Sequence, residues 1–238
     1  MVSPSRRERL RSATEAEIRH AARARLAAGG PAAVSLRAIA RDLGMTAPAI
    51  YRYFPSLDAL TAQLVADLLT ELREVVVAAR DQVPPTDPVR RLAELGRAYR
   101  RWALANRREF SLIFGERIPG LEAMDRCGTA AHQASIELGQ VFLTELYALW
   151  RHHGLSRPDR QPSASLTAAL SPEVLKHRGE VPVEVIQAYL SGWIRLYGVV
   201  AMEVFDQVAW VVTDPEPLFE SELAAYLREL GVPYPDQS

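Results

Sequence analysis

The side chains best suited to reading nucleic acid lie within residues 35–60. Small residues at 47–49 would let the start of a helix approach base edges closely, and the Tyr-Arg-Tyr run at 51–53 can hydrogen-bond phosphates or bases. A recognition helix places its N-terminal residues in the major groove of DNA in this way. An ordinary helical hairpin of an all-α protein is the alternative interpretation of the same layout.

Two short helices separated by a turn would position these side chains. Ser35 can cap the first helix by accepting a hydrogen bond from a first-turn amide, and apolar residues follow at helical spacing. Gly44 suits the left-handed residue that ends a helix. The second helix, expected over 47–53, would bury only Ile50 and Phe54 and leave its other side chains free. The pattern predicts a helix-turn-helix.

Residues 14–64 resemble the N-terminal domain of the TetR (tetracycline-repressor-like) family of bacterial transcriptional regulators. The matching runs are Ala38-Ile39-Ala40, Leu43-Gly44-Met45-Thr46, Ala49-Ile50-Tyr51-Arg52-Tyr53-Phe54-Pro55-Ser56 and Ala59-Leu60. One position departs from the family, which usually has a Lys after this Ser, where it supports a phosphate contact; Leu57 stands here. Tyr51, Arg52 and Tyr53 are therefore expected to carry more of the DNA docking.

The expected partner of this segment is double-stranded DNA with a palindromic operator. The residues predicted to contact it are Ser35, Arg37, Thr46, Ala47, Pro48, Ala49, Tyr51, Arg52 and Tyr53, joined by Arg6 and Arg7 from an N-terminal arm. Because alanine side chains offer no hydrogen bonds to bases, specificity is expected to depend on thymine-methyl contacts and DNA shape.

The charge distribution agrees with a DNA-binding head. Residues 1–57 contain ten arginines and four acidic residues, so they carry +6, whereas the whole chain carries −1. A basic head on an acidic body suits contact with a polyphosphate, although charge also simply solvates a surface. Residues 1–13 are expected to form a disordered basic arm, or only a solvated tail. A capping box at Thr14 and Glu17 predicts that the first helix spans 14–28.

The composition indicates a globular cytoplasmic protein. A single Cys127 excludes an internal disulfide, and no uninterrupted apolar run approaches the length of a membrane span, so we expect no membrane contact. The chain lacks a nucleophile elbow, a phosphate-binding glycine loop and a zinc-protease motif, and its histidines are scattered. We therefore expect no enzymatic activity, no cofactor and no metal.

Beyond the head, helical spacing without alternating strands predicts an all-α fold. The DNA-binding domain is expected at 14–60, a helical ligand-binding and dimerisation domain at 61–230 and a short tail at 231–238. The predicted helices are 57–80, 88–106, 108–114, 127–153, 183–212 and 214–230, with loops at 115–121 and 154–172.

The body carries a second set of recognisable runs, Ala98-Tyr99-Arg100-Arg101-Trp102-Ala103, Phe114-Gly115, Gly192-Trp193 and Tyr197-Gly198. They resemble a TetR-type ligand-binding subfamily named for a Trp-His-Gly signature, here with Tyr197 in place of the His. The resemblance implies a pocket for a small, largely apolar effector, although each aromatic residue taken alone is more often plain core. The candidate pocket residues are Tyr99, Trp102, Phe110, Phe114, His132, Phe142, Tyr147, Trp150, Trp193 and Tyr197.

Residues 183–230 carry apolar side chains on more than one helix face, which requires burial on two sides. One side would be the subunit core and the other a second subunit, and the resemblance implies the same homodimer. The sequence thus predicts a ligand-responsive repressor that leaves its operator when the effector binds. A helical small-molecule enzyme and a protein-interaction module remain as alternatives.

Overall fold

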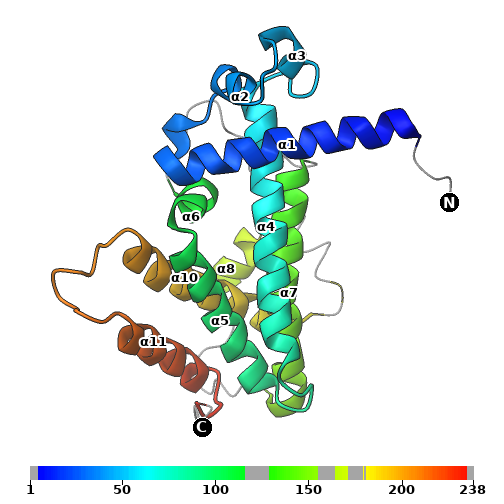
Figure 1. Ribbon diagram of the computed structural model, residues 1–238. Helices are drawn as coiled ribbons and strands as arrows, with labels where there is room; N and C mark the ends of the chain where they lie inside the picture. The colour runs from blue at the N-terminus through cyan, green and yellow to red at the C-terminus, as the bar shows by residue number, and fades with distance from the viewer. Residues whose placement is uncertain (1–4, 116–128, 155–163, 171–178, 180, 235–238) are drawn as a thin grey trace. The chain divides into compact units, whose positions relative to one another are not determined.

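The computed structural model describes residues 5–115, 129–154, 164–170, 179 and 181–234 (Figure 1). All regular structure in these ranges is helical, which confirms the predicted all-α fold. The chain divides into two compact units, a head unit of residues 1–71 and 106–137 and a body unit of residues 72–105 and 138–238. Helices α4 (Leu57–Asp81) and α7 (Ala130–His153) contribute residues to both units.

The head unit is built on α1, which crosses the first part of α4 (Figure 1). Its other elements are two short helices, a 3₁₀ turn and α6. The bounds are α1 Arg6–Gly29, the 3₁₀ turn Pro31–Ala33, α2 Leu36–Asp42, α3 Ala47–Tyr51 and α6 Arg107–Phe114. Ile18, Ala22 and Leu26 of α1 are completely buried, because their i, i+4 spacing places them on one face of the helix.

Helix α1 begins at Arg6, so the prediction of a disordered arm is wrong from that residue onward. The Ser5 hydroxyl accepts from the Glu8 amide at 3.2 Å, and the Glu8 carboxylate accepts from the Ser5 amide at 2.6 Å. This capping box starts the helix earlier than the one predicted at Thr14, whose hydroxyl donates to the Leu10 carbonyl within the helix.

The body unit packs α5 (Pro88–Ala105) against α10 (Val183–Val204) and α11 (Glu216–Glu229), with the second part of α7. Its centre is an aromatic trio. The rings of Tyr99, Phe142 and Trp193 meet edge to face, with centroids 5.7–6.4 Å apart. This geometry sets the positive edge of one ring against the negative face of the next, and it anchors three helices to one another.

Three arginines of α5 link this helix to its neighbours. Arg91 donates to Glu145 of α7 at 3.0 and 3.1 Å, and Arg100 donates to Glu203 of α10 at 2.7 Å from both nitrogens. Arg97 donates to Glu220 of α11 at 2.9 and 3.0 Å. These two-point hydrogen bonds raise the pKa of each guanidinium and fix the register between helices.

Several predicted boundaries differ from the structure. The helix expected over 183–212 ends at Val204, and turns follow in which Asp206 has a positive φ of 55°. The last helix begins at Glu216 because the Asp214 carboxylate accepts from the Glu216 amide at 3.1 Å. The predicted loop 154–172 contains a short helix, α8 (Ala164–Ala169). Residues 116–128, which include most of the loop at 115–121, and residues 155–163 and 171–172 lie outside the described ranges.

Helix α10 is unusually apolar for its degree of burial. Within the described ranges it is the one helix whose length and composition would allow it to cross a membrane. Only 22% of its most apolar 18-residue window is buried inside the subunit. The helix therefore presents an apolar surface that the single chain does not cover.

Candidate DNA-binding and ligand-binding sites

The helix-turn-helix forms as the sequence predicts. The Ser35 hydroxyl accepts from the Ala38 amide at 3.2 Å and caps α2. Gly44 adopts a φ of 63°, and the following Met45 amide donates to the Ala40 carbonyl at 2.8 Å. This left-handed turn, which glycine adopts at little cost, directs the chain into α3.

Helix α3 is held by two anchors and is otherwise presented to solvent. Ile50 is completely buried and Phe54 is nearly so, as predicted. The side chains of Ala47, Pro48, Tyr51 and Arg52 are exposed, whereas Ala49 and Tyr53 are half-buried. Tyr51 is 45% exposed, which is high for an aromatic side chain with no role in the core. The helix therefore offers its N-terminal small residues, Tyr51 and Arg52 to a ligand.

The remaining predicted DNA contacts are also at the surface. Ser35, Arg37 and Thr46 are exposed on and beside α2, and Arg6 and Arg7 are exposed in the first turn of α1. Leu57 is 36% exposed at the first position of α4, where the helix dipole favours an anion near the backbone amides. The structure thus brings the α2 and α3 residues together, and it places Arg6 and Arg7 on a helix instead of a free arm.

An ion pair that the sequence did not reveal braces α2 against α1. The Arg25 guanidinium donates to both Asp42 oxygens, at 2.6 and 2.8 Å, and also donates to the Ala38 carbonyl. The two hydrogen bonds from Arg25 hold the pKa of Asp42 below its usual value of 3.8. Since α2 and α3 pack together, this brace also supports α3.

Arg23 joins three helices of the head unit. Its guanidinium donates to Glu71 of α4, to Asn106 at 3.3 Å and to Glu109 of α6 at 3.5 Å. The hydrogen bonds to Glu71 are the main reason that the pKa of the Arg23 guanidinium is raised. Arg108 of α6 adds a bond to the Ala27 carbonyl at 2.8 Å. Helix α6 therefore belongs to the head unit, whereas the sequence pattern predicted it within the 61–230 domain.

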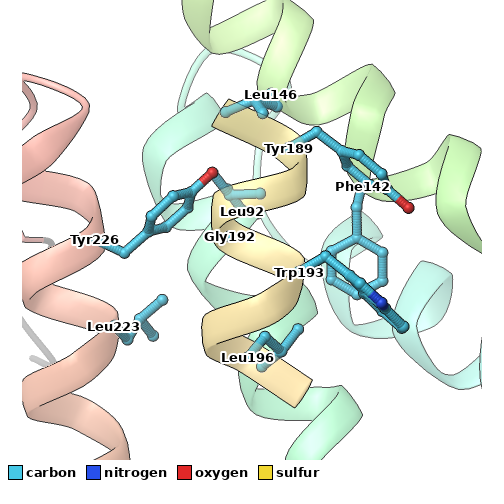
Figure 2. A pocket seen from close by; sticks show the side chains of 10 residues that line it. Leu92, Phe142, Leu146, Tyr189, Gly192, Trp193, Leu196, Leu223 and Tyr226 are labelled. Carbon is cyan, nitrogen blue, oxygen red and sulfur yellow. The ribbon is translucent and has the colours of Figure 1, made fainter. Parts of the chain in front are cut away.

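A cavity of about 50 Å³ lies between α5, α7, α10 and α11 of the body unit (Figure 2). Its lining is apolar apart from two tyrosine hydroxyls and the Trp193 indole nitrogen, and it includes no charged side chain. The lining residues are Leu92, Gly96, Phe142, Leu146, Tyr189, Gly192, Trp193, Leu196, Leu223 and Tyr226. Apolar sites between packed helices bind small organic molecules in many proteins.

The candidate pocket residues are distributed over both units. Phe142 and Trp193 line the cavity, and Tyr99 packs on both rings. Trp102 is buried in the body, Tyr147 and Trp150 stack on each other on α7, and Tyr197 is half-buried on α10. Phe110, Phe114 and His132 fall in the head unit.

Most of the cavity lining was not predicted from the sequence. Gly96 and Gly192 carry no side chain that could mark a pocket, and the leucines are indistinguishable from ordinary core. Tyr189 and Tyr226 could have been included as aromatic residues of the last two helices. Among the described residues no group of three or more His, Cys, Asp or Glu is arranged to hold a metal ion.

Comparison with known proteins identifies the family of both parts of the chain. Residues 18–64 match the family model described as "Bacterial regulatory proteins, tetR family", and residues 92–226 match "Tetracyclin repressor-like, C-terminal domain". The chain is 32% identical to the HTH-type transcriptional regulator Rv1816 of Mycobacterium tuberculosis (strain ATCC 25618 / H37Rv) over 239 residues, 94% of this chain and 96% of that protein. A regulator of Mycobacterium bovis (strain ATCC BAA-935 / AF2122/97), Mb1846, shows the same identity and coverage.

Solved structures show the same fold. The crystal structure of the regulatory protein SCO4313 has a TM-score of 0.72 and 29% sequence identity, and the match covers 95% of this chain and all of that one. A tetR-family regulatory protein from Rhodococcus RHA1 has a TM-score of 0.53 and 18% identity over 93% and 98% of the two chains. The helix-turn-helix, the apolar body and these relatives together establish that the chain belongs to the TetR family of DNA-binding transcriptional regulators.

Proposed function

We propose that this regulator is a homodimeric repressor that binds a palindromic operator through α3 and leaves it when a small, largely apolar molecule occupies the body cavity. The observation that carries the proposal is the face of α3. Its small residues, Tyr51 and Arg52 are exposed on a unit that is rich in arginine, while Ile50 and Phe54 fix the helix from behind. This is the arrangement that major-groove recognition requires.

The surface of α10 supports a dimer. Ile194, Gly198 and Met202 follow one another at i, i+4 spacing and lie on one side of the helix. Ile194 is 69% exposed, Met202 is exposed, and a Cβ added to Gly198 would meet no atom within 4 Å. Phe205, Trp210 and Val211 extend this exposed apolar surface beyond the helix end. A second copy of the chain would bury it, and paired heads suit an operator with two half-sites.

The predicted dimer surface is narrower than residues 183–230. The large apolar side chains Phe219 and Leu227 of α11 are buried within the subunit, and Leu218 and Leu223 are half-buried. Within residues 183–230 the exposed large apolar residues are on α10 and in the turns that follow it. We therefore place the centre of the interface on α10.

Release from DNA would follow from binding in the cavity. A ligand shifts an equilibrium only by the difference in its affinity for the two states. The cavity-lining residues Leu92 and Gly96 are on α5, and this helix is separated from α6 by Asn106 alone. Since α6 is tied to α1 and α4 through Arg23, a displacement of α5 has a covalent route to the head unit.

The DNA-binding part is tested with an operator selected from random-sequence DNA by the purified protein. In a shift assay at fixed salt, Tyr51→Ala and Arg52→Ala should each weaken binding about tenfold or more, because each contact contributes about 1–3 kcal/mol. Arg101→Ala is the matched control, since it removes an exposed arginine of the body. If both head variants bind like the wild type, the assignment of α3 is wrong.

The oligomeric state is tested by light scattering. Ile194→Glu places a charge in the proposed interface and should convert the dimer to monomers at micromolar concentration. Val75→Glu is the matched control, because it introduces the same charge at an exposed apolar residue of α4. A monomeric wild type, or a dimer that tolerates Ile194→Glu, would contradict the proposed interface.

A further inference from the structure

Two tyrosines of the cavity wall lie directly against glycines of neighbouring helices. A Cβ added to Gly192 of α10 would be only 2.5 Å from the Cζ and Oη atoms of Tyr226. A Cβ added to Gly139 of α7 would be 2.7 Å from the Oη atom of Tyr189. Real Cβ atoms do not approach other atoms this closely, so the Tyr226 ring and the Tyr189 hydroxyl each occupy space that a glycine leaves open.

Tyr226 is fixed in this position by a hydrogen bond. Its hydroxyl donates to the Ala188 carbonyl of α10 at 2.9 Å, and both groups are buried. Figure 2 shows the ring extending from α11 toward Gly192, with the hydroxyl at the α10 side. Moving this ring would therefore break a buried hydrogen bond as well as change the shape of the cavity.

The other glycine of the lining, Gly96, provides a contrast. A Cβ added to Gly96 of α5 would lie 3.8–3.9 Å from Leu196, Leu223 and Phe219, which is ordinary van der Waals contact. Gly96 could therefore become alanine with little rearrangement. Of Gly96, Gly139 and Gly192, the two that face tyrosines are therefore the ones where an added methyl group would force a neighbour to move.

We infer that the Gly192–Tyr226 and Gly139–Tyr189 pairs limit the size of the effectors that fit, and that the uncharged lining restricts the site to small uncharged molecules. The inference rests on the proposal that this cavity is the effector site. Its volume of about 50 Å³ exceeds the ~10–15 Å³ that one water molecule needs. Because no charged side chain lines it, an ionic guest would lose its hydration without gaining a counter-ion.

The charge preference is tested on the full-length protein by calorimetry with three matched probes, toluene, benzoate and benzylammonium. Toluene should bind at least about tenfold more tightly than either ion, since an unpaired buried charge costs more than about 1.4 kcal/mol. Equal or tighter binding of an ion, or no binding of toluene, would overturn the inference.

The size selection is tested with toluene and naphthalene. Gly192→Ala should weaken toluene binding about tenfold, because the new methyl group forces the Tyr226 ring away from α10 at a cost of about 1–3 kcal/mol. Gly96→Ala should weaken it by no more than about threefold, since its methyl group makes only ordinary contacts. Equal effects of the two substitutions would contradict the role of the Gly192–Tyr226 pair.

The double variant Gly192→Ala/Tyr226→Ala removes the clash between the new methyl group and the Tyr226 ring. It therefore keeps the test valid if Gly192→Ala alone fails to fold. Its larger cavity should shift the ratio of naphthalene to toluene affinity at least about tenfold toward naphthalene, because each buried methylene-sized contact is worth about 0.8 kcal/mol. Tyr189→Ala should shift the same ratio in the same direction. An unchanged ratio in both variants would overturn the inference.

An operator shift assay with the same probes separates this inference from the proposed function. If the variants change probe selection as expected but no probe affects DNA binding, the size selection stands and the effector role of the cavity fails. If a probe releases the wild type from DNA but the variants keep the wild-type ratio of naphthalene to toluene affinity, the repressor mechanism stands and the inference fails.

Discussion

The head and the body units use their side chains in opposite ways. In the head unit most of the residues that would contact DNA are exposed, and the buried Ile50 and Phe54 only hold α3 in place. In the body unit the cavity is lined by Phe142 and Trp193, which are at the same time part of the aromatic core. A substitution at an exposed DNA-contact residue of the head unit should therefore leave stability unchanged. A substitution in the cavity of the body unit should change both ligand binding and stability.

The largest effect is expected for the core of the body. Tyr99→Ala removes a completely buried ring that packs on Phe142 and Trp193, and it should lower the free energy of unfolding by about 4 kcal/mol. Urea unfolding monitored by circular dichroism measures this loss. Tyr51→Ala is the matched substitution in the head and should change the unfolding free energy by no more than about 0.5 kcal/mol. Similar losses for the two variants would remove the distinction between the units.

A smaller loss of stability is expected when the three-helix junction of the head is broken. Arg23→Met leaves the buried Glu109 without its partner, and Arg23 is about one third exposed. We expect a loss of about 2 kcal/mol, below the ~3–5 kcal/mol of fully buried pairs because solvent screens this one.

The double variant Arg23→Met/Glu109→Gln tests the cause, since it also removes the stranded charge. It should recover part of the loss in the same urea experiment, and hydrogen exchange should show α6 protected again. A double variant less stable than Arg23→Met would indicate that packing, and not the ion pair, holds α6.

The expectation that Leu57 stands where a Lys would support a phosphate contact can be tested. Leu57→Lys should tighten operator binding severalfold at low salt and steepen the slope of log K against log salt by about 0.9 for each additional phosphate that the protein neutralises. Leu57→Gln controls for loss of the apolar side chain. The slope is measured by shift assays between roughly 50 and 200 mM salt, the range over which binding through phosphates weakens strongly. An unchanged slope would place Leu57 away from the DNA backbone.

The smallest effect is expected at the start of α1. Ser5→Ala removes the capping hydroxyl and should destabilise the first turns by about 1 kcal/mol. Hydrogen exchange of residues 6–13 should become faster, while the global melting temperature stays the same. Thr14→Ala is the control, because the Thr14 hydroxyl lies within the helix and caps nothing. Faster exchange in the Thr14→Ala variant, and not in Ser5→Ala, would indicate that the stable helix begins at Thr14.

The head could be predicted from the sequence because its signals are local. The Ser35 cap, the left-handed Gly44 and the buried Ile50 are all decided within a few residues, and the structure confirms each. The start of α1 was missed because two capping patterns compete, at Ser5–Glu8 and at Thr14–Glu17. The ion pair between Arg11 and Glu15 at 2.9 Å supports the longer helix, which uses the earlier pattern.

The cavity and the links between helices depend on partners far apart in the sequence. Nothing near Gly192 indicates that Tyr226 will lie on it, and nothing near Arg23 indicates Glu109, 86 residues away. The family resemblance implied a pocket, but the aromatic residues proposed for it could not be separated into Phe110 and Phe114 of the head unit and Phe142 of the body unit. Such pairings follow from helix packing, which the local pattern does not specify.

The exposed Trp210 gives the protein a built-in optical reporter. Its side chain is 86% exposed in the single subunit, and its indole N–H donates to the Gln207 carbonyl at 3.1 Å, whereas Trp102 is buried. Emission from Trp210 should therefore be red-shifted and open to quenching by iodide whenever the surface around it is uncovered. Protein concentration, operator and effector can then each be varied while the quenching reports, without any label, whether that surface is covered.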